Sequence, residues 1–197
     1  NESSHATLAG GEGDDNIHNS GATVSISGGA GNDTILNGYN EEYAGSYVTI
    51  EGGDGNDYIE NHGWDTSINS GDGNDTIIND YGQDDATINT GTGDDYISNE
   101  GGYVLYQYAE GDGNDYISGF DENSTLQITA GSVESATING EDILLTIGDA
   151  TITLAGAAQL EKPNLFNPDG RRGRKQKVIN GTSAHAPLFK KLNNLSN

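Results

Sequence analysis

The sequence predicts an all-β fold, a parallel β-roll in which short strands stack coil upon coil. Three observations predict it. A motif rich in glycine and aspartate recurs through the first part of the chain, its copies lie 18 to 24 residues apart, and apolar residues alternate with polar ones beside it. A fold of this kind buries its core only when neighbouring coils stack on one another.

The motif occurs six times with the shared core Gly, any, Gly, Asn or Asp, Asp, any, Ile. Its last aspartates are separated by 18, 24, 18, 20 and 20 residues. Since 18 is twice nine, we expect each coil to contain two half-turns of nine residues, with the motif always on the same edge. The extra residues of the longer coils are expected on the opposite edge, in variable turns.

Strands are expected on both sides of each motif turn. The strand that follows each motif turn carries one inward isoleucine. The strand that follows each variable turn, here called the second strand, has an apolar-any-apolar pattern that is weaker at Thr66 and Ala86. The isoleucines are Ile17, Ile35, Ile59, Ile77, Ile97 and Ile117, and the clearest pairs of the second strand are Val24 and Ile26, Val48 and Ile50, Tyr106 and Tyr108, and Leu126 and Ile128. Stacked coils would align these side chains into two facing apolar ladders.

Asparagine recurs two residues after the inward isoleucine. The positions are Asn19, Asn37, Asn61, Asn79 and Asn99, with Gly119 in the sixth copy. Two interpretations are open at this stage. The amides stack and pass hydrogen bonds from coil to coil, or asparagine is present because it suits turns.

The motif turns supply the ligands that calcium prefers. Calcium takes six to eight oxygen ligands at roughly 2.3–2.6 Å. We number the motif from the residue before its first shared glycine, which is Gly10 in the first copy. Glycine at the second and fourth positions then permits positive φ and inward carbonyls, and aspartate at the sixth position adds a carboxylate. The candidate metal-binding residues are Gly11, Gly13, Asp15, Gly29, Gly31, Asp33, Gly53, Gly55, Asp57, Gly71, Gly73, Asp75, Gly91, Gly93, Asp95, Gly111, Gly113 and Asp115.

Six turns leave five gaps, so we expect about five Ca²⁺ ions in one column along one edge. Without metal, six carboxylates would stack at the strand spacing of roughly 4.8 Å and repel one another. Binding and folding should therefore be coupled.

The distribution of charge agrees with a metal-binding body. Residues 1–160 hold 29 acidic residues and no Lys or Arg, whereas the rest holds eight basic and two acidic residues. Such a body suits cations and argues against binding nucleic acid or anionic membranes. The sequence has no apolar run long enough to span a membrane, and no Ser-His-Asp, Cys-His or nucleotide-binding pattern, so we expect no enzyme active site.

These repeats resemble the GGxGxDxUx nonapeptide of RTX proteins, the hemolysin-type calcium-binding repeat, over about residues 8–120. The resemblance implies a right-handed parallel β-roll, folding induced by Ca²⁺, and type I secretion of a bacterial exoprotein to the extracellular space. Rolls of that family typically carry the motif on both edges and hold two ion columns. Here the motif is on one edge, so one column is expected.

Three regions are expected along the chain. Residues 1–123 form the roll with six metal-type turns, residues 124–160 form capping strands, and residues 161–197 form a basic tail. The cap is predicted from the alternation of 143–147 and 151–154 around Gly148-Asp149, which is typical of a β-hairpin.

The tail has a different composition, with all three prolines of the sequence and the run DGRRGRKQK from Asp169. We expect a less structured tail or a linker. The alternatives are that this positive segment docks on the acidic roll or belongs to an export signal.

The leading hypothesis is a calcium-binding module of a larger secreted protein, present as a monomer or as a fragment of a longer chain. One alternative is an adhesin or carbohydrate-binding surface with an unknown cell-surface or glycan target, and another is the accessory C-terminal region of an extracellular enzyme. The adhesin alternative rests on the variable turns, where aromatic side chains would either cover the edge of the roll or stack on sugars. These aromatic residues are Trp64, Tyr39, Tyr43, Tyr47, Tyr81 and Tyr103.

Overall fold

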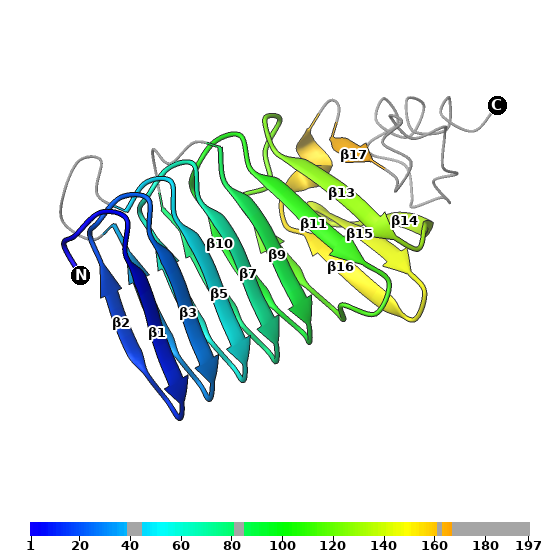
Figure 1. Ribbon diagram of the computed structural model, residues 1–197. Helices are drawn as coiled ribbons and strands as arrows, with labels where there is room; N and C mark the ends of the chain where they lie inside the picture. The colour runs from blue at the N-terminus through cyan, green and yellow to red at the C-terminus, as the bar shows by residue number, and fades with distance from the viewer. Residues whose placement is uncertain (39–44, 81–84, 161–162, 167–197) are drawn as a thin grey trace.

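The computed structural model describes residues 1–38, 45–80, 85–160 and 163–166. Over these ranges the strands form two sheets that face each other across a narrow interior (Figure 1). The first sheet has eight strands in the order β1-β3-β5-β7-β9-β11-β13-β17, and the second has nine in the order β14-β15-β16-β12-β10-β8-β6-β4-β2. Through the roll the chain passes from one sheet to the other and back, which confirms the predicted parallel β-roll.

The strands of the first sheet are β1 (Thr7–Glu12), β3 (Ser25–Ala30), β5 (Thr49–Asp54), β7 (Ser67–Asp72), β9 (Thr87–Thr92), β11 (Leu105–Ala109), β13 (Thr125–Ala130) and β17 (Asn164–Phe166). Those of the second sheet are β2 (Asn16–Asn19), β4 (Thr34–Asn37), β6 (Tyr58–Asn61), β8 (Thr76–Asn79), β10 (Tyr96–Asn99), β12 (Tyr116–Ser118), β14 (Val133–Asn139), β15 (Asp142–Ile147) and β16 (Ala150–Leu154). One short 3₁₀ helix, η1 (Ala157–Gln159), follows them within the described residues.

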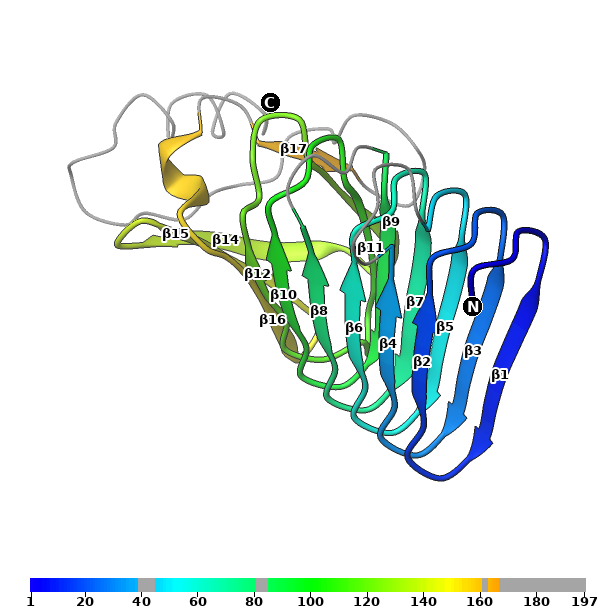
Figure 2. The ribbon, with the colours of Figure 1, turned by 90° about the vertical axis from the view of Figure 1, so that its left-hand side faces the viewer.

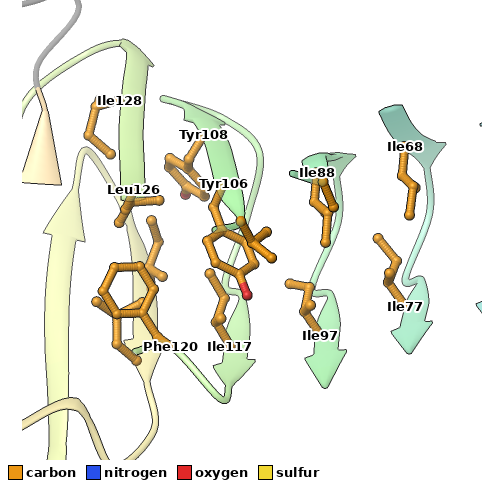
Figure 3. Close-up of a cluster of buried hydrophobic side chains, with 14 of the residues drawn as sticks. Ile68, Ile77, Ile88, Ile97, Tyr106, Tyr108, Ile117, Phe120, Leu126 and Ile128 are labelled. Carbon is orange, nitrogen blue, oxygen red and sulfur yellow. The ribbon is translucent and has the colours of Figure 1, made fainter. Parts of the chain in front are cut away.

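The core is the pair of apolar ladders expected from the sequence. Ile50 pairs with Ile68 across β5 and β7, and Ile59 pairs with Ile77 across β6 and β8. Figure 3 shows the two ladders facing each other, for example Ile88 opposite Ile97. All of these isoleucines are at most 1% exposed. Because each coil adds only a few such residues, the roll depends on contact with neighbouring coils.

The stacked amides predicted from the recurrent asparagines are present. The Nδ2 of Asn37 donates to Oδ1 of Asn61 at 2.8 Å, and Nδ2 of Asn61 donates to Oδ1 of Asn79 at 2.8 Å. Asn19, at the N-terminal end of the ladder, and Asn99, at the other end, continue it with the same kind of bond. The amides of Asn19, Asn37, Asn61 and Asn99 also bond the backbone of their own turns. The ladder therefore joins the coils along the edge that carries the variable turns.

Replacing an asparagine inside the ladder should destabilise the protein clearly. Asn61→Ala removes the bonds of Asn61 to Asn37, Asn79 and Gly63, all of them buried. We expect the free energy of unfolding to fall by about 2–4 kcal/mol, because buried polar partners lose their bonds. The measurement is chemical unfolding followed by circular dichroism. Asn69→Ala is the control, since Asn69 is exposed on β7, and an equal loss there would contradict the prediction.

The predicted hairpin forms a cap on the second sheet. β15 pairs with β16 in an antiparallel manner around Gly148 and Asp149, and β14 pairs with β15 in the same way. β16 then lies parallel to β12, with Thr153 opposite Tyr116 (Figure 2). The cap therefore extends the sheet of the roll and buries its own apolar face, including Leu145 and Ile152.

One expectation about the register is wrong. The 24-residue coil carries its extra residues on the variable edge, between Asn37 and Thr49, as expected. In the sixth coil the extra residues fall on the motif edge instead, because Gln107 pairs with Asn89 while Tyr116 pairs with Tyr96. Gln107 and Tyr116 of the sixth coil are nine positions apart in the sequence, whereas Asn89 and Tyr96 of the fifth coil are seven apart. The sixth motif turn is therefore two residues longer.

Candidate metal centre

The six motif turns lie side by side along one edge of the roll, at the bottom of Figure 1. Glycines at the second and fourth positions have positive φ, for example +124° at Gly53 and +128° at Gly55. L-residues with a side chain rarely adopt this conformation. Stacking adds a second reason for glycine, because a Cβ on Gly53 would overlap the carbonyl oxygen of Gly29 in the preceding coil.

The sixth-position aspartates form a column at the inner side of these turns. One carboxylate oxygen of each, apart from Asp15 in the first coil, is held by the backbone of the preceding coil. The N–H of Asp33 donates to Oδ1 of Asp57 at 2.8 Å, and the N–H of Asp57 donates to Oδ1 of Asp75 at 2.8 Å. The same bond joins Asp15 to Asp33, Asp75 to Asp95 and Asp95 to Asp115. The column is therefore fixed by backbone geometry.

The second oxygen of most of these carboxylates is left without a hydrogen bond. We call these atoms, the Oδ2 of Asp15, Asp33, Asp57, Asp75 and Asp95, the inner oxygens. Each is buried, and none has a hydrogen-bond partner among the described residues. Asp33 and Asp57 as whole residues are 1% and 2% exposed. A buried carboxylate oxygen without a donor is costly unless a proton or a cation neutralises it.

Burial dominates the acidity of the column. Desolvation raises the pKa of Asp57 to about 6, that of Asp115 to about 7 and that of Asp95 to about 8. It also raises the pKa of Asp75. Neighbouring carboxylates of the column add repulsion at Asp57 and Asp95, which acts in the same direction. In the absence of metal these side chains would therefore hold protons more tightly than exposed aspartates do.

The surroundings of the inner oxygens fit a hard cation. At the first position of the turn, a Cβ on Gly10 would lie 2.5 Å from Oδ2 of Asp15 and 2.5 Å from the carbonyl oxygen of Gly28 in the next coil. Gly28 and Gly52 hold the same two kinds of oxygen close to the place of the missing Cβ. Carboxylate and carbonyl oxygens are the ligands that Ca²⁺ selects, and glycine lets these two oxygens approach each other because no side chain lies between them.

Backbone carbonyls are essential to such a site. In the described part of the chain, no group of three or more His, Asp or Glu side chains converges as metal ligands would. The first three gaps each bring together an inner oxygen and a main-chain oxygen of the next coil. This agrees with the tolerance of the third position, where Glu12, Ala30 and Thr92 all occur.

The sixth turn differs from the other five. The Oη of Tyr108 donates to the carbonyl of Gly113 at 2.6 Å, and the N–H of Ala109 donates to Oδ2 of Asp112 at 2.6 Å. A Cβ on Gly111 would have no described atom within 4 Å. Gly111 is thus displaced from the glycine column, although Asp115 remains in the aspartate column.

The variable edge has a regular backbone feature that the sequence did not reveal. One residue with a side chain adopts positive φ in each of the six coils, with φ between 52° and 62°. These residues are His5, Thr23, Tyr47, Asp65, Asp85 and Tyr103. Their identities share no pattern, so only the strand register could have aligned them.

Two exposed aromatic residues lie at these positions. Tyr47 is 55% exposed and packs against Trp64, with ring centroids 5.5 Å apart, while Tyr103 is 60% exposed. Trp64 is half-buried, as a cover over the edge would be, whereas Tyr103 projects into solvent. Tyr39, Tyr43 and Tyr81, also considered as covers or sugar-binding residues, lie outside the described residues, as does most of the predicted tail.

No family model and no curated protein sequence matches the chain. Among solved structures, the crystal structure of the extracellular lipase LipA from Serratia marcescens is similar, with a TM-score of 0.47 and 17% sequence identity. The match covers 77% of this chain and 36% of the lipase chain, so this chain spans about a third of that protein. In the described ranges, no helix has the length and apolar character needed to cross a membrane.

Proposed function

We propose that this chain is a non-catalytic, calcium-binding module of the RTX type, which folds on binding Ca²⁺ and belongs to a larger secreted protein. The observation that carries the proposal is the column of inner oxygens. They are buried carboxylate oxygens without a donor among the described residues, and in the first three coils they lie close to a main-chain oxygen of the next coil, where glycine places no side chain between them. A cation between the coils would satisfy oxygens from both coils at once. Residues of the motif turns would hold it, and its contribution would be charge neutralisation.

The electrostatics of the body support the same function. Residues 1–160 carry 29 acidic residues without a single Lys or Arg. In a compact roll this charge opposes folding until cations offset it. Calcium that binds only the stacked coils would therefore contribute directly to the free energy of folding.

A calcium titration tests the proposal. In calcium-free buffer at pH 7.5 we expect little β-structure by circular dichroism, and a cooperative gain of β-structure as calcium is added. Magnesium at the same concentrations should not substitute, because it requires smaller octahedral sites and releases its water reluctantly. Full order in calcium-free buffer at this pH, or an equal response to magnesium, would contradict the proposal.

A matched pair of variants locates the site. Asp57→Asn keeps the acceptor for the N–H of Asp33 but removes the charge from an inner oxygen. We expect it to raise the calcium concentration at the folding midpoint at least about tenfold, the equivalent of about 1.4 kcal/mol. Asp54→Asn removes the same charge from an exposed position of the same turn. Similar shifts in both variants would mean that calcium responds to overall charge and not to the column.

The second candidate is a glycan-binding surface on the variable edge, favoured by the exposed rings of Tyr47 and Tyr103. Tyrosine rings at such exposure can stack on sugar faces. A glycan array probed with calcium-loaded protein, with a Tyr47→Ala, Tyr103→Ala double variant beside it, tests this candidate. Binding that is lost in the double variant would support it, and an array without binding would count against it.

A further inference from the structure

The first position of the motif turn changes chemical character along the roll. It is glycine in the first three coils, at Gly10, Gly28 and Gly52. It is a hydroxyl residue in the next two, Ser70 and Thr90. In the sixth coil Tyr108 takes the corresponding strand position, because Gln107 pairs with Asn89. The column of turns therefore has a glycine part, formed by the first three coils, and a hydroxyl part, formed by the fourth and fifth coils.

The three first-position glycines are not required by the backbone. Their φ angles lie outside the left-handed region, unlike those of the glycines at the second and fourth positions. What they permit is a close approach of the oxygens around them. A Cβ at Gly10, Gly28 or Gly52 would press against the inner oxygen of its own coil and against the first-position carbonyl oxygen of the next coil. Each of the first three gaps thus presents two oxygens toward a place without a side chain.

In the hydroxyl part, side chains of the protein bond these same kinds of oxygen. Ser70 is fully buried and its Oγ donates to the carbonyl of Thr90 at 2.7 Å. Thr90 is 4% exposed and its Oγ1 donates to Oδ2 of Asp115 at 3.0 Å. In the same gap, the Oη of Tyr108 donates to the carbonyl of Gly113. In the last two gaps these side chains therefore occupy the first position and each bond one oxygen across the gap, while Oδ2 of Asp75 and Oδ2 of Asp95 keep no hydrogen-bond partner among the described residues.

We infer that the first residue of each turn determines whether the following gap binds calcium. The three glycine gaps bind one ion each, and the two hydroxyl gaps are closed by their own side chains. This deepens the proposed function and rests on it. It lowers the expected stoichiometry from about five ions to about three, with the ions in the N-terminal part of the column.

Two reciprocal substitutions test the inference by counting ions. Ser70→Gly opens the fourth gap, where the inner oxygen of Asp75 is already in place, and should raise the count by one. Gly52→Ser fills the third gap and should lower the count by one. Ser67→Gly is the control for backbone flexibility, since Ser67 is exposed on the same strand as Ser70. The count is measured by native mass spectrometry and by calorimetric titration with calcium chloride.

The outcomes separate this inference from the function on which it rests. About three ions in the wild type and about four in Ser70→Gly support it. About five in both, or the same count in Ser70→Gly as in Ser67→Gly, overturns it while leaving the calcium function standing. A wild type that binds no calcium overturns both. The gain in Ser70→Gly decides the question even if Gly52→Ser fails to fold.

Discussion

Gly53→Ala is expected to abolish cooperative folding, even with saturating calcium. Gly53 has φ +124°, and its missing Cβ would overlap the carbonyl oxygen of Gly29. The alanine must therefore both distort the turn and push two coils apart. Since these effects act together in the middle of the aspartate column, we expect a loss above about 4 kcal/mol, which is exceptional for one substitution. Chemical unfolding in calcium, followed by circular dichroism and tryptophan fluorescence, measures it.

Gly111→Ala provides the matched control. Gly111 occupies the same motif position with φ +104°, yet no described atom lies within 4 Å of its potential Cβ. The only cost expected for that alanine is its unfavourable backbone conformation, roughly 1–3 kcal/mol. A smaller loss at Gly111 than at Gly53 would assign the difference to contact between coils. Equal losses would mean that conformation alone selects glycine in these turns.

The repeat made most of the fold predictable. Because side chains of a strand alternate with a period of two, the recurrence of isoleucine at fixed distances from the motif specifies which face points inward. The same spacing placed Asn37, Asn61 and Asn79 in one ladder, and the structure supplied the bonds between them. Local pattern and stacking agree at these positions, so little else was needed.

The sixth turn could not be predicted because its motif sequence and its strand pairing give different alignments with the fifth coil. The run GDGND aligns Glu110 with Thr90 by motif, but strand pairing places Gln107 opposite Asn89, which brings Tyr108 to the position that corresponds to Thr90. Tyr108 is 2% exposed, and burying its ring sets the register of β11. The motif then has to span two additional residues. A buried aromatic residue thus outweighed a turn sequence, which only side-chain packing could show.

The hydrogen bonding of the inner oxygens also could not be predicted from the sequence. The motif indicated that the aspartates would approach one another, but it did not indicate that a backbone N–H of the preceding coil would hold one oxygen of every aspartate after Asp15. Nor did it distinguish the effect of glycine from that of serine at the first position, because the sequence does not show which atoms surround that position. The difference appears only when the space beside the carboxylate is known.

Without calcium, acid is expected to stabilise the roll. The pKa of Asp57, Asp115 and Asp95 is raised in the folded state to about 6, 7 and 8. The folded state therefore binds more protons than the unfolded chain between about pH 4 and pH 8, and stability is lost as pH rises through this window. In calcium-free buffer we expect β-structure and cooperative thermal unfolding near pH 4.5, with both lost by pH 8. With calcium, order should persist at pH 8, since ions bound between the coils offset the negative charge of the column.

Substitutions at two adjacent residues of one turn separate the effect of a column carboxylate on stability from the effect of overall negative charge. Asp95→Asn removes the carboxylate with the highest of these pKa values and should raise the metal-free stability at pH 8, by an amount on the order of 3–5 kcal/mol. Asp94 is fully exposed, and hydrogen bonds from Asn114 lower its pKa, so Asp94→Asn should not stabilise the protein at pH 8. If both variants stabilised it equally, relief of overall negative charge would explain the effect. If Asp95→Asn alone does so, the cost resides in the buried carboxylate, and calcium or a proton is what the column requires to remain closed.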